Sequence, residues 1–236
     1  MKYIAFALII FSSCAFTLRQ NSDTKTGFPL AYVQDFEDPA SMGYFVFSDP
    51  EPWFLTGGKN GGRALEFAGK GNYETRVRSP FIVGLISDFV FGDFVLEADL
   101  LQTGKEYGHR DMCVFFGFQD STRFYYVHMA SKADPNAHNV FIVNDAPRTN
   151  IAKKTTDGIR WIDEHWHHIR IERLTNEGRI EVYFDDMDTP IMIASDKTFT
   201  GGYLGFGSFD DTGKIDNIQI WSPDASRSES PFFSKK

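Results

Sequence analysis

Short stretches in which apolar and polar side chains alternate recur along most of the chain. In residues 178–184, Ile180, Val182 and Phe184 fall on one face, whereas the residues between them are charged or amphipathic, a pattern typical of a half-buried strand. Residues 94–100 repeat this period of two. Further strand-like runs cover 64–67, 112–118, 123–129, 139–143, 168–173, 203–209 and 215–221.

Turn signals rich in glycine and asparagine separate these runs, and no segment shows a convincing helical period. Such pairs and triplets stand at 57–58, 61–62, 176–178, 201–202 and 211–213. Many short strands joined by regular turns predict an all-β fold, because sandwiches and barrels hide both sheet faces of such chains. We expect a two-sheet antiparallel jelly-roll sandwich.

The N-terminus predicts export. One basic residue, an apolar run over 4–11 and small residues behind it are typical of a secretory signal, which we place at 1–15. Ordinary cleavage near Cys14 leads to a periplasmic or secreted protein, whereas a lipid on Cys14 leads to an outer-membrane lipoprotein. No other segment is apolar for long enough to cross a bilayer.

The remaining chain fits one domain with a substantial core. We divide it into a polar linker over 16–28, a domain over 29–222 and a disordered tail over 223–236, the last because it is rich in serine and charge. The net charge of −8 argues against nucleic acid as a partner. Cys113 is the single cysteine outside the signal, and we expect a buried, inert thiol.

The C-terminal half carries a further pattern. Its main segments are Trp166–Arg173, Ile180–Asp186, Gly202–Asp211 and Lys214–Ile218. These segments resemble the concanavalin A-like lectin/glucanase superfamily, in particular bacterial laminin-G-like and keto-disaccharide-hydrolase-like domains. The resemblance covers roughly 30–222 and implies two curved antiparallel sheets with a carbohydrate as partner. It is weak for activity, because one fold hosts lectins, hydrolases, lyases and adhesion modules.

The same resemblance implies a structural Ca²⁺ held between an acidic residue near the N-terminus and one in the last strand. The matching positions are Asp35 and Asp216. Carboxylates with loop carbonyls suit this hard cation. The alternative is two solvated aspartates at strand ends. Nothing indicates an organic cofactor.

Residues 101–150 differ from the rest, because five basic and five acidic residues give this segment no formal charge in an acidic chain. The segment also holds His109, His128 and His138, with Tyr107, Tyr125 and Tyr126 nearby. Arginine grips a carboxylate or sulfate with two hydrogen bonds, so this patch predicts an anionic saccharide as ligand.

Within residues 123–129, Tyr126 and His128 fall on the face of Phe124, about 7 Å apart along the strand. They are the candidates for proton transfer, with ordinary sheet packing as the alternative. Further candidates for binding the saccharide are Arg148, His138, Asn139, Arg110 and Arg123. Arg148, His138 and Asn139 are the ones assigned to neutralising its carboxylate.

These residue types suit β-elimination from a uronic acid, which makes the chain a carbon–oxygen lyase or a dehydratase. A hydrolase of the keto-disaccharide type, a non-catalytic carbohydrate-binding module and an adhesion role stay open. Hydrolysis by Glu97 and Asp99 is disfavoured, because they read as the polar face of an ordinary strand. A metal at His165, His167 and His168 is also disfavoured, since neighbours in a strand point to opposite faces.

Overall fold

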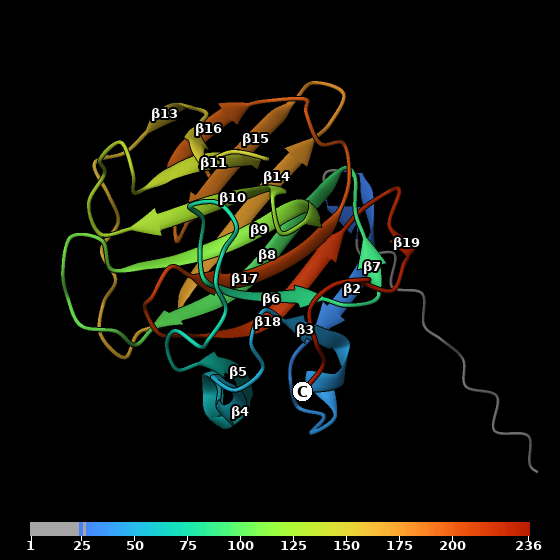
Figure 1. Ribbon diagram of the computed structural model, residues 1–236, viewed down its shortest axis with the longest axis vertical. Helices are drawn as coiled ribbons and strands as arrows, with labels where there is room; N and C mark the ends of the chain where they lie inside the picture. The colour runs from blue at the N-terminus through green and yellow to red at the C-terminus, as the bar shows by residue number, and fades with distance from the viewer. Residues whose placement is uncertain (1–23, 26) are drawn as a thin grey trace, which may run out of the picture.

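The computed structural model describes residues 24–25 and 27–236 (Figure 1). The predicted signal over 1–15, Cys14 and most of the predicted linker lie outside these residues. In the described part, nearly all regular structure is β, apart from two short 3-10 turns at Ser41–Tyr44 and Lys59–Gly61. None of the helical segments in this part has the length and apolar character to cross a bilayer.

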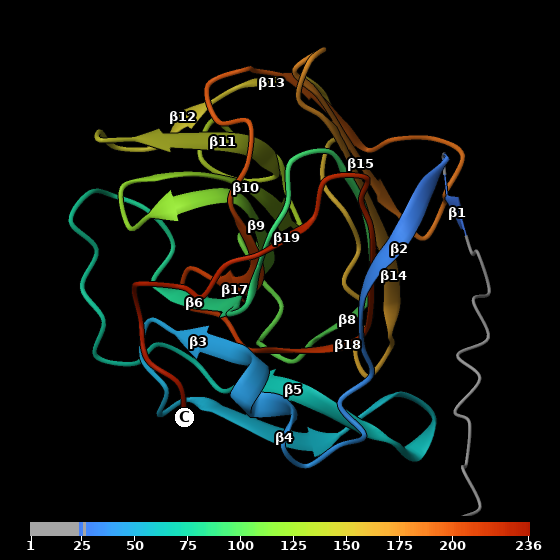
Figure 2. The same ribbon diagram turned by 90° about the vertical axis from the view of Figure 1, so that its right-hand side faces the viewer.

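Two large antiparallel sheets form the body of the described chain (Figure 2). The larger sheet runs β1-β2-β18-β8-β14-β15-β16-β13, and β5 joins β4 to β18. Its strands are β1 (Thr24–Lys25), β2 (Phe28–Gln34), β4 (Trp53–Gly57), β5 (Arg63–Phe67), β8 (Phe94–Gln102), β13 (Ala152–Thr155), β14 (His167–Leu174), β15 (Arg179–Phe184), β16 (Met192–Ser195) and β18 (Gly213–Trp221).

The second sheet runs β12-β11-β10-β9-β17-β6-β3. Its strands are β3 (Phe45–Phe47), β6 (Ile82–Ile86), β9 (Asp111–Asp120), β10 (Arg123–Ala130), β11 (Asn139–Asn144), β12 (Thr149–Asn150) and β17 (Tyr203–Ser208). A small extra pair joins β7 (Phe89–Val90) to β19 (Ser226–Arg227). The predicted two-sheet antiparallel jelly-roll sandwich is confirmed.

The main core lies between the two sheets. Alternation decides which side chains enter it: β14 reads buried and half-buried in strict turn, so that Ile169 and Ile171 pack inward while His168 and Arg170 face outward. Alternate residues of the predicted strands at 94–100, 168–173 and 178–184 enter the core in the same way, although β8 is buried on both faces. Burial of these branched apolar side chains is the main stabilising contribution.

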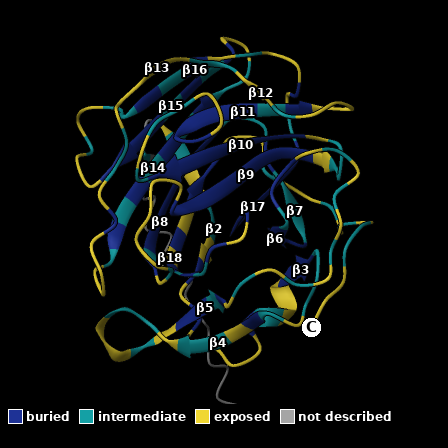
Figure 3. Cartoon of the chain, turned by 60° about the vertical axis from the view of Figure 1, so that its left-hand side comes forward, coloured by how far each residue is buried: buried dark blue, intermediate teal, exposed yellow. Residues whose placement is uncertain are grey.

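The seven-stranded sheet is buried on both faces, and Figure 3 shows β9 and β10 almost entirely in the buried colour. A second apolar cluster covers its outer face, with Phe115, Phe118, Phe124 and Tyr126 at its centre. The segment 68–81 crosses in front of these strands (Figure 1) and packs Val77 and Phe81 against the cluster. This second layer explains why these strands read as continuous apolar runs.

The C-terminal tail packs against the same face. Phe232 and Phe233 lie against the outer cluster, with ring centroids 5.4 and 5.8 Å from that of Phe118. The backbone of Ser234 exchanges hydrogen bonds with Phe47. The sequence predicted a disordered tail over 223–236, whereas in this structure Phe232 and Phe233 pack on the sheet. Two apolar rings within a serine-rich and charged stretch provide the burial that the average composition hides.

Candidate functional site

A hollow of about 300 Å³ opens where β9 begins and β10 ends. Its walls come from five connections: the segment before β6, the turn before β9, the turns between β10 and β11 and between β11 and β12, and the turn after β17. The lining residues are Arg78, Phe81, Tyr107, His109, Asp111, His128, Asn136, Arg148, Phe209 and Asp210. We call this hollow the Arg148 pocket. Among the lining residues, Tyr107, His109, His128 and Arg148 are the Tyr, His and Arg residues that the segment 101–150 contributes.

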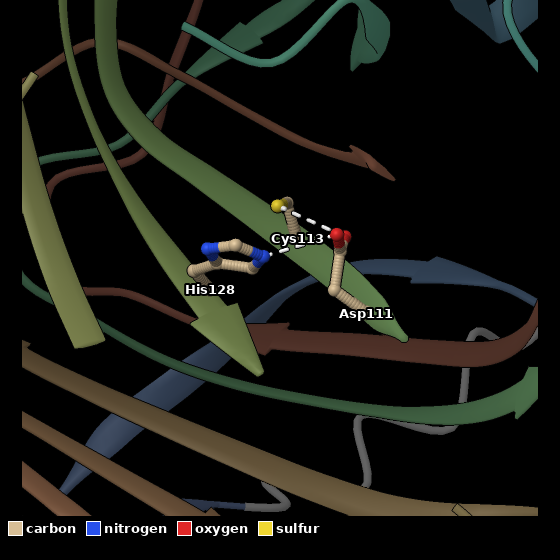
Figure 4. A group of neighbouring side chains, drawn as sticks. All are labelled: Asp111, Cys113 and His128. Carbon is tan, nitrogen blue, oxygen red and sulfur yellow. Dashed lines mark hydrogen bonds and ion pairs between the residues drawn. The ribbon is translucent and has the colours of Figure 1, made fainter. Parts of the chain in front are cut away.

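Register sets the floor of the pocket. Asp111 and Cys113 are two residues apart and therefore share one face of β9. His128 on β10 stands directly opposite Cys113. Nε2 of His128 lies 3.0 Å from Oδ2 of Asp111, and Sγ of Cys113 lies 3.6 Å from Oδ1 of the same carboxylate. Figure 4 shows the three side chains converging from the two neighbouring strands. All three residues are at most 3% exposed.

Neighbouring groups hold this floor in place. Nδ1 of His128 donates a hydrogen bond to the Asn136 carbonyl (3.2 Å), and the Ser208 hydroxyl donates to Oδ1 of Asp111 (2.7 Å). Burial, reinforced by Asp111, raises the pKa of the Cys113 thiol well above its usual value. The buried thiol expected from the sequence is confirmed.

Arg148 forms one wall of the pocket. Its guanidinium lies over Phe209, with Cζ 4.3 Å from the ring centroid, and Nη2 donates to the Asn136 carbonyl (3.0 Å). Nε and Nη1 are shielded from solvent and have no hydrogen-bond partner in the described part of the chain. Its backbone N–H donates to the carbonyl of Arg78 (3.2 Å), which fixes the covering segment 68–81 beside it.

The mouth of the pocket carries two further titratable side chains, those of His109 and Tyr107. His109 is exposed, and its Nε2 lies 2.5 Å from Oδ2 of Asp134. Tyr107 donates its hydroxyl to Oδ2 of Asp211 (2.9 Å), while burial and the nearby Asp211 raise the pKa of that hydroxyl. Burial, with Asp111 as the next cause, raises the pKa of Asp211 to about 6.

Of the predicted proton-transfer pair, His128 lines the pocket and Tyr126 lies beside it. Their rings share a face as expected, with centroids 6.2 Å apart. The Tyr126 hydroxyl is buried and makes no well-directed hydrogen bond among residues 24–25 and 27–236; burial raises its pKa well above the ordinary value, although the nearby Arg148 acts in the opposite direction.

The other predicted saccharide-binding residues lie outside the Arg148 pocket. His138 is buried with Nε2 2.9 Å from the Thr156 hydroxyl, and burial lowers its pKa to about 4. Asn139 donates to the backbone carbonyls of residues 134 and 137. Arg110 is buried against Gln102 and reaches Asp163 at 2.8 Å, so it cross-links loops. Arg123 pairs with Asp120 at the β9–β10 turn.

The predicted calcium ligands show different surroundings. Asp35 is exposed and accepts a hydrogen bond from the backbone of Glu37 (3.2 Å). Asp216 is buried, and its two carboxylate oxygens accept from the backbone N–H groups of Lys59 (2.9 Å) and Asn217 (2.7 Å). Calcium at these positions stays a prediction.

Two motifs set aside at the sequence level behave as expected. Glu97 and Asp99 form the outward face of β8, where His168 and Lys59 pair with them. His167 points the other way and is buried at 2.7 Å from Asp185. The sequence did not point to Arg78, Phe81 or Asp111, because their approach to His128 depends on strand register and on the path of a long connection.

No protein-family model matches the chain, and no curated protein matches it by sequence. Solved structures do match. Carbohydrate-binding module CBM66 from Bacillus subtilis superposes with a TM-score of 0.53 at 18% identity, covering 76% of this chain and 96% of the module. The fold is a concanavalin A-like jelly roll.

Two further structures support this assignment of fold. A candidate glycosyl hydrolase from Parabacteroides distasonis gives a TM-score of 0.53 at 14% identity, covering 81% of this chain and 100% of that one. A Bacillus subtilis protein with a galectin-like fold gives 0.52 at 11% identity, covering 84% and 97%. The jelly-roll fold that the resemblance of residues 166–218 implied is thereby confirmed.

Proposed function

We propose that this chain is a carbohydrate-active protein that binds an anionic saccharide in the Arg148 pocket and acts on it by β-elimination. The observation that carries the proposal is the position of Arg148: its guanidinium lies over Phe209 in the pocket wall, and two of its nitrogens make no well-directed hydrogen bond in the described chain. A guanidinium with unused donors is a preferred partner for a carboxylate, and a sugar carboxylate in the hollow would engage them once the side chain turns these nitrogens toward it. The names of the structural neighbours, a carbohydrate-binding module and a candidate glycosyl hydrolase, agree with a saccharide ligand.

The pocket suits a sugar ring as well as its charge. Phe81 and Phe209 supply apolar faces, with ring centroids 5.8 Å apart, and Arg148 lies over one of them. Sugar rings present apolar C–H faces and polar edges, so aromatic walls beside a guanidinium match both parts of a uronic acid.

Elimination needs a base, an acid and a cation. The base takes the proton from the carbon that bears the carboxylate, the electron pair forms a double bond to the neighbouring carbon, and the C–O bond on that carbon breaks. The leaving oxygen then takes a proton, and Arg148 stabilises the negative charge that gathers on the carboxylate meanwhile. A departing sugar makes the protein a lyase, and a departing hydroxyl makes it a dehydratase.

We assign the base to His109 and the acid to Tyr107. His109 is exposed at the pocket mouth, where Asp134 orients its ring, and the Tyr107 hydroxyl, which donates to Asp211 here, is the proton donor that lines the same mouth. The sequence predicted His128 and Tyr126 as the acid–base pair. We move both roles to the mouth because His128 is buried in the pocket floor with its Nδ1 bonded to Asn136, and because the Tyr126 hydroxyl is shielded from solvent.

The test incubates the purified protein with uronate oligosaccharides from ulvan, alginate, pectin and glucuronan, and follows the ultraviolet absorbance of the new conjugated double bond. The proposal expects this absorbance to rise with at least one substrate, and to fall to background in Arg148→Gln but not in Arg123→Gln. Reducing ends released without the chromophore would instead indicate a hydrolase. Saturable binding with no product would indicate a binding module. Export stays a prediction from residues 1–15.

A further inference from the structure

A different property of the pocket floor concerns metal ions. Asp111, Cys113 and His128 each offer one ligand atom, and these atoms lie within 4.8 Å of one another. A tetrahedral zinc site needs ligand atoms roughly 3.3–3.8 Å apart, so small side-chain rotations would bring them onto one ion. We propose that Asp111, Cys113 and His128 form a binding site for a divalent transition metal of the zinc class.

The donor set selects this class of ion. A thiolate, an imidazole and a carboxylate together suit a borderline-soft cation, whereas calcium and magnesium require oxygen donors. Two anionic ligands balance the charge of a divalent ion, which relieves the burial of the Asp111 carboxylate in the floor. Three protein ligands leave a fourth position for water or for a ligand entering the pocket.

An independent observation points to a missing partner. Nε2 of His128 is shielded from solvent and makes no well-directed hydrogen bond within the described chain, although it lies 3.0 Å from Asp111. Nδ1 of the same ring donates to the Asn136 carbonyl, which leaves the lone pair on Nε2, the atom that faces the cluster.

The supporting groups match those of a metal site. Ligating histidines commonly donate their second nitrogen to a backbone carbonyl, and ligating carboxylates are themselves hydrogen-bonded. Asn136 and Ser208 make these two contacts here. Asp111 and His128 also line the Arg148 pocket, so the site has an entry path. The metal site goes beyond the proposed function and stands whether or not the pocket accepts a saccharide.

The experiment strips the full chain with a chelator and titrates it with Zn²⁺ alone against a chromophoric competitor. We expect one Zn²⁺ per chain, and binding weakened by about 100-fold or more in Cys113→Ser and Asp111→Asn, because even outer contacts contribute about 10- to 100-fold. His165→Gln, which changes an exposed histidine outside the cluster, controls for surface binding and should leave the affinity unchanged.

Loading with Co²⁺ gives a second readout that needs no variant. The site predicts a thiolate-to-cobalt charge-transfer band and the strong visible bands of tetrahedral Co²⁺, with the charge-transfer band absent in Cys113→Ser. Wild-type protein that binds no stoichiometric Zn²⁺, or that binds Co²⁺ without a thiolate band, overturns the site. So does an equal loss of affinity in His165→Gln. Uronate turnover is scored separately, so failure of the metal site and failure of the proposed function are distinguishable.

Discussion

Nε2 of His128 lies 3.0 Å from Oδ2 of Asp111, and the two residues come from different strands of a hairpin, one near the end of β10 and the other at the start of β9. Antiparallel pairing brings them together. His128 stands opposite Cys113, and Asp111 lies two residues before Cys113 on the same face of β9. As a result, two strands that are mostly apolar place a carboxylate and an imidazole in the floor of the Arg148 pocket. Asp111 and His128 in the floor are buried, whereas His109 at the mouth is exposed to solvent.

Replacement of His109 tests its proposed role as the base. His109→Gln should lower kcat for uronate elimination by about 100-fold or more, with KM little changed, because a positioned base contributes about 10²–10⁴-fold. Asp134→Asn should give a smaller loss, since it orients the ring without touching substrate. Steady-state kinetics measure both, and His165→Gln serves as the control. A KM effect with unchanged kcat would place His109 in binding instead.

The C-terminal tail should contribute to stability. Phe232 is half-buried, packing on Phe118 and, edge to face, on Tyr203 at 5.4 Å. Phe232→Ala should lower the free energy of unfolding by about 1–2 kcal/mol, less than for a fully buried ring. Urea unfolding measures this, and exposed Glu229→Ala, expected within about 0.5 kcal/mol of wild type, is the control. Equal stabilities for the two variants would mean that the tail does not pack in solution.

His168 should make stability depend on pH. Hydrogen bonds to Asp99 and then Glu97 raise the pKa of His168 from 6.5 to about 9. Because the folded pKa is the higher one, the stabilising contribution is complete below about pH 6.5 and is lost as the pH rises through about 9. His168 is 40% exposed, so solvent screening limits the effect to on the order of 1 kcal/mol.

Unfolding curves of wild type and His168→Gln across pH 6 to 10 measure that contribution. The difference between the two proteins should be largest at the acidic end and vanish at the alkaline end. A difference that grows with rising pH would contradict the ion pairs on the outward face of β8. His167 is present in both proteins and cancels from the comparison.

The fold could be predicted from the chain because alternation is local. Ile169, Ile171 and their counterparts on β15 mark the inward face of the larger sheet without any knowledge of its neighbours. The packing of the tail could not be predicted from its polar composition, because it depends on two phenylalanines that contact a sheet face formed by distant strands.

The site could be predicted only in part. Placing His128 and Arg148 in a chemical patch needed composition alone, and both line the pocket. Asp111 could not be found this way, because its approach to His128 depends on the register of β9 and β10. His138 and Asn139 belong to the same patch, yet the local backbone turns them toward Thr156 and the 134–137 turn. Composition locates a segment, whereas the turn geometry decides which side chains meet.

A pair of matched ligands tests the central claim most directly. One uronate oligosaccharide and its carboxyl-reduced counterpart are titrated calorimetrically into wild type and Arg148→Gln. Charge-assisted hydrogen bonds contribute about 1.5–3 kcal/mol, so the uronate should bind wild type about 10- to 100-fold more tightly than the reduced form. Arg148→Gln should remove that preference. Equal affinity of wild type for the two ligands, or a preference that survives in Arg148→Gln, would contradict the proposed anionic-saccharide site.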